Sequence, residues 1–126
     1  MGVSVNAQKW KTDREIDFNN DGDVIKASPG VLWGFELVTT DADTPIFVKF
    51  YDQTTAPNPA ADTPKLVFGA SSTSAAGTPP DVSSLGRAFA GGIEFTTGIA
   101  WLCTTGIADA DDNDAGTVTI GTAYYN

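Results

Sequence analysis

The sequence predicts an all-β protein, either a two-sheet antiparallel sandwich or a small barrel. Short segments rich in Val, Ile, Thr and aromatic residues alternate apolar with polar positions, which is the pattern of half-buried strands. Clusters of Asp, Pro and Gly separate these segments at fairly regular spacing, as turns do in sandwiches and barrels. No stretch keeps the hydrophobic period of an amphipathic helix.

The clearest strand is predicted at residues 31–38. Its alternation places one set of side chains together, Val31, Trp33, Phe35 and Leu37, and leaves Gly34 and Glu36 on the other face. Residues 46–51 repeat the pattern, with Ile46, Val48 and Phe50 on one face. The polar segment 39–45 has the length of a hairpin connection, so we expect these two strands to pair antiparallel.

Shorter elements follow in the middle of the chain. Residues 52–64 are rich in Pro, Ala, Thr and Asp and predict a loop, which leads into a short strand at 65–68. The small and polar residues 69–80 are typical of a surface loop that serves as a connector.

The last third is again rich in strands. Residues 92–96 alternate, and Thr97-Gly98 predicts a kink or bulge. Residues 99–104 are apolar on both faces, which indicates a central strand. After an acidic turn at 109–116, a final strand is expected at 117–125. Its residues on one face are Val118, Ile120 and Tyr124.

The chain has 126 residues, the size of one compact domain, and we assign the sandwich to residues 23–126. Residues 1–22 fit this body poorly and are expected to form an N-terminal arm or an added edge strand. No stretch is apolar enough to cross a membrane, and the first residues lack the apolar core of a signal peptide. We therefore expect neither a membrane partner nor classical secretion.

Composition argues against several functional classes. The chain has no His and one Cys. A single chain can therefore form neither an intrachain disulfide nor a His-type zinc site, and it lacks the His needed for Ser-His-Asp or Cys-His catalysis. The formal net charge of −9 argues against nucleic acid as a partner. We expect Cys103 to be a buried, inert thiol and Trp33 and Trp101 to be core aromatics.

Acidic residues suggest cation or acid–base chemistry only weakly. Residues 17–23 match the first half of a calcium loop, but Ser28 stands at the twelfth position, where a Glu is needed. A turn explains the same residues, and the acidic segment 109–114 is typical of a solvated loop tip. Glu36 and Glu94 are the only acidic residues well inside predicted strands, and both are expected to be exposed. We therefore predict no catalytic residue, metal or cofactor, with cation binding by either segment as the alternative.

A basic, Trp-containing patch near the N-terminus is the one candidate contact site. It consists of Lys9, Trp10, Lys11 and Arg14 on an otherwise acidic chain. A Trp flanked by cations suits a contact with another chain. Alternatively, this segment folds back and buries Trp10 on its own domain.

Residues 24–34, VIKASPGVLWG, resemble a segment that opens small virion proteins of tailed bacteriophages, known as head decoration, capsid cement or head-fibre proteins. Further segments follow in the order that this family would give. They are VKFYD at 48–52, Asp62-Thr63-Pro64, GIEFTTGI at 92–99, and Thr104-Thr105-Gly106 leading to a strand that ends in Tyr124. The resemblance covers residues 24–125, and residues 1–22 have no counterpart in it.

The resemblance implies a jelly-roll-like β-sandwich without catalytic residues. Such proteins sit on the outer surface of the capsid, are made in the bacterial cytoplasm, commonly form homotrimers and bridge major capsid protein subunits. The patch from Lys9 to Arg14 would then reach toward an acidic region of the capsid.

Two other functions remain open. One is a head fibre or adhesin that binds a carbohydrate or receptor, for which exposed Tyr51 and Tyr125 are the candidates. The other is an enzyme of unassigned type, which would need carboxylates converging in a pocket.

Overall fold

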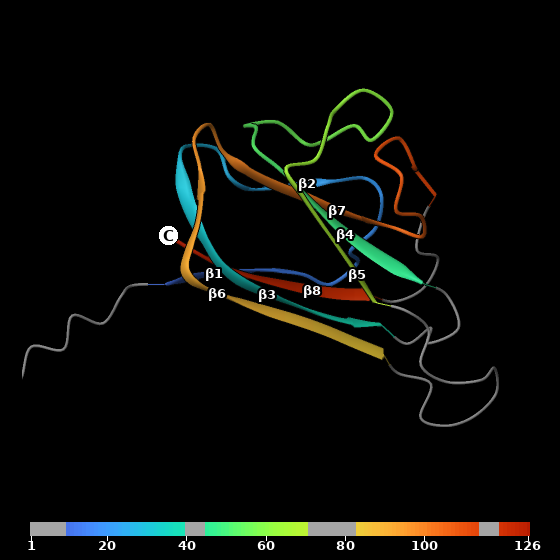
Figure 1. Cartoon of the computed structure of the whole chain (residues 1–126), viewed down its shortest axis with the longest axis horizontal. Coiled ribbons are helices and arrows are strands. Elements are labelled where there is room, and N and C mark those ends of the chain that lie inside the picture. Colours follow the sequence, from blue (N-terminus) through green and yellow to red (C-terminus); the bar gives the residue numbers. More distant parts are fainter. Residues whose placement is uncertain (1–9, 40–44, 71–82, 114–118) are drawn as a thin grey trace, which may run out of the picture.

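The computed structural model describes residues 10–39, 45–70, 83–113 and 119–126. Eight strands lie in these ranges, and none of the residues described is helical (Figure 1). The strands are β1 (Lys11–Glu15), β2 (Asp23–Lys26), β3 (Gly30–Thr39), β4 (Ile46–Tyr51), β5 (Leu66–Ala70), β6 (Ser83–Phe95), β7 (Ile99–Thr104) and β8 (Thr119–Tyr125). A search of these residues for a helix able to cross a membrane finds none.

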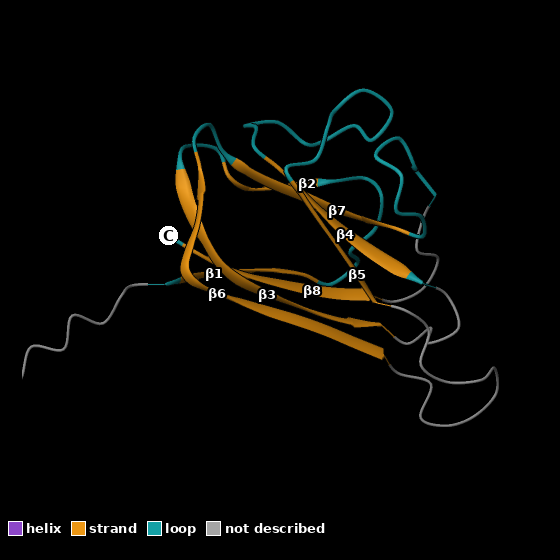
Figure 2. Ribbon diagram, in the orientation of Figure 1, coloured by secondary structure: helices purple, strands orange, loops and turns teal. Residues whose placement is uncertain are grey.

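The strands form two antiparallel sheets of four strands each, in the orders β1-β8-β3-β6 and β2-β7-β4-β5. The sheets pack face to face (Figure 2), and the hydrophobic core lies between them. Phe35 of β3 and Phe50 of β4 meet across this core with ring centroids 5.2 Å apart. Trp101 of β7 is fully buried beside them. The predicted all-β antiparallel sandwich is confirmed.

The expected pairing of the strands at 31–38 and 46–51 is wrong. Strand β3 pairs with β6 and β8, whereas β4 pairs with β5 and β7 in the opposite sheet. A short polar connection can close a hairpin or cross from one sheet to the other, and strand periodicity does not distinguish the two. The predicted loop at 69–80 lies mostly outside the residues described.

Strand β7 lies between β2 and β4, and all six of its residues are buried, which confirms the predicted central strand. Strand β6 runs from Ser83 to Phe95 and is much longer than the predicted 92–96. Gly91 and Gly92 have positive φ angles of 80° and 74°, conformations that side chains disfavour, and they let β6 bend along its length. The predicted kink at Thr97-Gly98 is the connection between β6 and β7.

Residues 10–22 belong to the packed structure. Strand β1 is an edge strand that pairs with β8, with Lys11 opposite Tyr125 and Glu15 opposite Gly121. After it, Phe18 is 2% exposed, and its ring centroid lies 4.2 Å from that of Trp101. This early segment therefore supplies part of the core.

Loops cover the outer face of the β2-β7-β4-β5 sheet. Tyr51, Ala100 and Leu102 form a second buried cluster on this face. The fully buried Lys49 amine donates to the carbonyl oxygens of Ala108 at 2.6 Å and Asp111 at 3.3 Å. In Figure 1 the loops at 52–65 and 105–113 lie on this side of the molecule, away from the other sheet.

Candidate functional site

The outer face of the β1-β8-β3-β6 sheet carries a shallow trough. Residues opposite one another on its four strands form two rows there. The first row is Thr12, Tyr124, Gly34 and Ala88, and the second is Arg14, Thr122, Glu36 and Gly86. Because Gly34, Gly86 and Ala88 are small, the floor is low, and a trough of about 400 Å³ opens above it.

A β-bulge places Trp33 at one end of the trough. Leu32 pairs with Tyr125 and Gly34 with Tyr124, so β3 carries one extra residue, Trp33, relative to β8. On the other side the longer segment belongs to β6, where residues 89–92 lie between the partners of Leu32 and Gly34. Leu32 and Phe35 are therefore both buried in the core, while Trp33 lines the trough. The prediction that Trp33 is a core aromatic on the same face as Phe35 is wrong for this reason, whereas that for Trp101 is confirmed.

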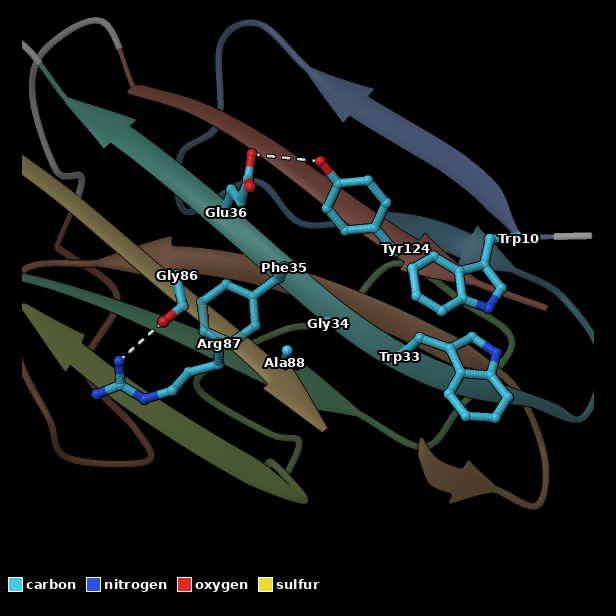
Figure 3. Close-up of a pocket in the computed structure, with 9 residues that line it drawn as sticks. All are labelled: Trp10, Trp33, Gly34, Phe35, Glu36, Gly86, Arg87, Ala88 and Tyr124. Atoms are coloured by element: carbon cyan, nitrogen blue, oxygen red, sulfur yellow. Dashed lines mark hydrogen bonds between the residues drawn. The ribbon is translucent and has the colours of Figure 1, made fainter. Parts of the chain in front are cut away.

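Trp10 stands next to Trp33 at this end (Figure 3). The two ring centroids are 6.0 Å apart, and the ring planes differ by 15°. Trp10 nevertheless remains 54% exposed. It thus packs against its own domain without being buried there, and it still presents a large aromatic surface. The expected contact of Trp10 with another chain stays a prediction.

The basic residues of the N-terminal patch do not all share this face. Arg14 is exposed and lies two residues from Thr12, so both point outward with Trp10. Lys11 is exposed but alternates to the other side of β1. Lys9 lies outside the residues described.

Polar groups line the opposite end of the trough. The Tyr124 hydroxyl donates to Glu36 Oε2 at 3.2 Å, and Arg87 Nη1 donates to the carbonyl oxygen of Gly86 at 2.9 Å (Figure 3). Burial raises the pKa of Tyr124, and the Glu36 carboxylate raises it further. Tyr124 therefore stays protonated at neutral pH and orients the carboxylate.

The two glycines of the floor differ in what they tolerate. A Cβ at Gly34 would lie 2.6 Å from the Arg87 carbonyl oxygen, so the close approach of β3 and β6 requires glycine there. A Cβ at Gly86 would make only ordinary contacts, the nearest at 3.7 Å to the Phe35 carbonyl oxygen. The trough can therefore be filled from Gly86 without straining the backbone.

The two acidic segments lie side by side at another place. Asn20 Nδ2 donates to the Asp112 carbonyl oxygen at 2.6 Å, which joins the loop before β2 to the loop after β7. Residues 17–23 form turns, in which the Asp21 amide donates to Asn19 Oδ1 at 2.9 Å and Gly22 has a φ of 72°. In the residues described, no group of three Asp, Glu or Cys side chains is arranged to hold a metal ion.

A further acidic group lies where β1 approaches β2. Burial raises the pKa of Asp13, and the nearby Asp23 carboxylate raises it further. The same two causes raise the pKa of Glu15. These carboxylates disfavour one another's charge, which makes this end of the sandwich less stable as they ionise.

The other candidate residues occupy structural or simple surface positions. Tyr51 is 0% exposed, so the expectation that it forms an exposed binding surface is wrong: the covering loops bury it, and burial raises its pKa to about 12. Tyr125 is half-buried and packs against the core. Glu36 and Glu94 are exposed, and Cys103 is buried, as predicted.

Comparisons of the chain with protein-family models, with curated proteins and with solved structures found no match. The trough was not predicted from the sequence, because three of its residues lie far apart along the chain: Trp33, Arg87 and Tyr124. The small outward residues at positions 34, 86 and 88 were the available signal.

Proposed function

We propose that the protein is a non-enzymatic decoration protein of a tailed-phage virion, which binds the outside of the capsid and bridges major capsid protein subunits. The observation that carries this proposal is the ordered resemblance over residues 24–125, which runs through seven of the eight strands of one sandwich. A fold alone does not imply function, so these segments and the surface they support carry the proposal.

The resembling segments also depend on one another structurally. Asp52, the last residue of VKFYD, accepts hydrogen bonds from the amides of Thr96 at 3.0 Å, Thr97 at 2.8 Å and Gly98 at 3.2 Å, all within GIEFTTGI. Lys65 donates to the Glu94 carbonyl oxygen at 2.6 Å, beside the same connection. The segments therefore act as one unit that holds the two sheets together.

Capsid binding would stabilise the shell by linkage. A protein that binds several subunits only in the expanded lattice favours that lattice by its binding free energy. Many copies on one particle add avidity without a strong single contact. A homotrimer would cover sheet edges that are otherwise free to pair with other chains.

We assign the capsid contact to the N-terminal patch: Lys9, Trp10, Lys11 and Arg14. Lys11 and Arg14 are exposed cations on a chain whose net charge is −9, so they suit an acidic region of the capsid. Trp10 adds an exposed apolar surface on the side of β1 to which Arg14 points.

The test uses expanded heads of the parent phage that lack this protein. We expect the purified chain to bind them saturably, to raise the temperature at which they open, and to bind unexpanded heads far less. Light scattering of the free protein should give the mass of a trimer. Absence of binding to both kinds of head, or turnover of a small molecule by the purified chain, would overturn the proposal.

A charge variant tests the contact itself. Lys11→Gln with Arg14→Gln should weaken binding to heads about tenfold at low salt, with less effect at high salt. Thr54→Asp with Ala56→Asp makes the same change in net charge on an exposed loop and should bind as the wild type does. Equal binding by all three proteins would exclude the patch as the contact.

A further inference from the structure

The two ends of the trough offer a ligand different chemistry. At one end the nearly parallel rings of Trp10 and Trp33 form an aromatic surface, of which Trp10 is more than half exposed. The face of an aromatic ring carries partial negative charge, so it attracts the polarised C–H groups of a ligand. This end suits a flat group that is apolar on one side.

The other end offers hydrogen bonds of both kinds. Glu36 can accept bonds in addition to the one from Tyr124, because a carboxylate has several lone pairs. The exposed Arg87 guanidinium donates one bond to the Gly86 carbonyl oxygen and carries further N–H groups. The Glu36 carboxylate lies on the outer face, and Arg87 lines the trough from the edge strand β6, where it stands opposite the core residue Phe35. Both residues lie away from the indoles (Figure 3).

We propose that this trough binds a neutral sugar, with the C–H face of a pyranose ring on the two indoles and its hydroxyl groups bonded to Glu36 and Arg87. A hydroxyl both donates and accepts, so hydroxyls on different carbons of the ring can bond to the carboxylate and to the guanidinium separately. The low floor at Gly34, Gly86 and Ala88 leaves room for a flat ring.

The volume and charge of the trough indicate which ligand it would bind. A volume of about 400 Å³ lies in the range of small-molecule sites, which combine apolar walls with a few placed polar groups. The Glu36 carboxylate and the net charge of −9 oppose an anionic sugar. The inference goes beyond capsid binding: it shares Trp10 with the assigned capsid contact, but it needs neither Lys11 nor Arg14 and concerns the part of the face centred on β3.

The test is a titration of the full chain with neutral trisaccharides of glucose, galactose, mannose or N-acetylglucosamine, with sialyllactose as the anionic comparison. Calorimetry and tryptophan fluorescence report binding. We expect at least one neutral trisaccharide to bind with a Kd of about 0.1–1 mM, and sialyllactose to bind at least about tenfold more weakly. If no neutral trisaccharide binds up to about 10 mM, or if sialyllactose binds best, the proposal is overturned.

Variants locate the site. Trp10→Ala removes the exposed half of the aromatic surface, and Gly86→Leu fills the floor, so each should weaken sugar binding about tenfold or more. Ile107→Ala truncates an apolar side chain that is 67% exposed outside the trough and should bind within about twofold of the wild type. Wild-type affinity in both trough variants would overturn the proposal. Gly86→Leu should still decorate heads normally, so failure of sugar binding and failure of capsid binding are observed separately.

Discussion

The two outer faces of the sandwich are built in opposite ways. On the β2-β7-β4-β5 sheet, loops at 52–65 and 105–113 cover the surface, and even Lys49 is 0% exposed. On the β1-β8-β3-β6 sheet the corresponding face is open, and Trp10 is 54% exposed. Exposed aromatic side chains grouped on one face are candidates for contact with a partner or ligand. The covered face contributes to stability, and the open face carries the proposed sugar site.

Among changes at the two outer faces, the largest loss of stability is expected on the covered one. Lys49→Ala leaves the carbonyl oxygens of Ala108 and Asp111 without their donor and opens a cavity beneath the loop, so we expect a loss of about 3 kcal/mol in the free energy of unfolding. Urea denaturation measures this loss. Lys11→Ala, at an exposed site on β1, is the control and should change stability by less than about 0.5 kcal/mol. Equal losses in the two variants would contradict the assigned role of Lys49.

The next largest loss of stability is expected at Asp52, at the end of the sandwich where the chain passes from one sheet to the other. Burial of Asp52 raises its pKa, but the amides of Thr96, Thr97 and Gly98 and the Thr96 hydroxyl outweigh this and lower it to about 2. Asp52→Asn should therefore cost about 2 kcal/mol at neutral pH. The carboxylate stabilises the fold fully above its unfolded pKa of about 3.8, and this contribution is lost as the pH falls through about 2.

Unfolding of wild type and Asp52→Asn across this acid range tests the assignment. The difference between their free energies of unfolding should shrink below about pH 4. A difference that stays constant down to about pH 2 would show that the carboxylate charge does not act as described.

Smaller changes in stability are expected from substitutions of the two glycines in the floor of the open face. Gly34→Ala forces a Cβ against the Arg87 carbonyl oxygen and should destabilise by about 1–3 kcal/mol. Gly86→Ala meets no such contact and should stabilise by about 0.5–1 kcal/mol, since alanine loses less backbone freedom on folding. Thermal unfolding of the pair is informative, because both remove a floor glycine. Destabilisation of the same size in both would mean that the floor is equally tight throughout.

The smallest effect is expected at the exposed aromatic itself. Trp10→Ala should cost about 1 kcal/mol or less, because only the stacking on Trp33 is lost. Trp101→Ala, which empties the centre of the core, should cost about 3–5 kcal/mol. A loss at Trp10 as large as that at Trp101 would mean that Trp10 is a core residue and not a ligand-facing one.

Sequence periodicity was sufficient for the fold class and for the buried strand β7, since both depend on local alternation or its absence. It did not determine which strands pair, because a short turn suits a hairpin and a crossing between sheets equally well. It also misplaced Trp33, because the bulge of one residue in β3 relative to β8 reverses the face of every side chain beyond it. The trough depends on both features, so it could not be predicted before the pairing was known.

The pairing of β1 with β8 has a consequence for how the molecule assembles. Strand β1 has no partner until β8 has been synthesised, and the aromatic contact of Phe18 with Trp101 also joins residues that are remote in sequence. Closing so long a loop is slow, so the sandwich is expected to be completed only after translation has passed β8. Until then β1 and one edge of β3 lack the strand that pairs with them, and a folding intermediate would be prone to aggregate there.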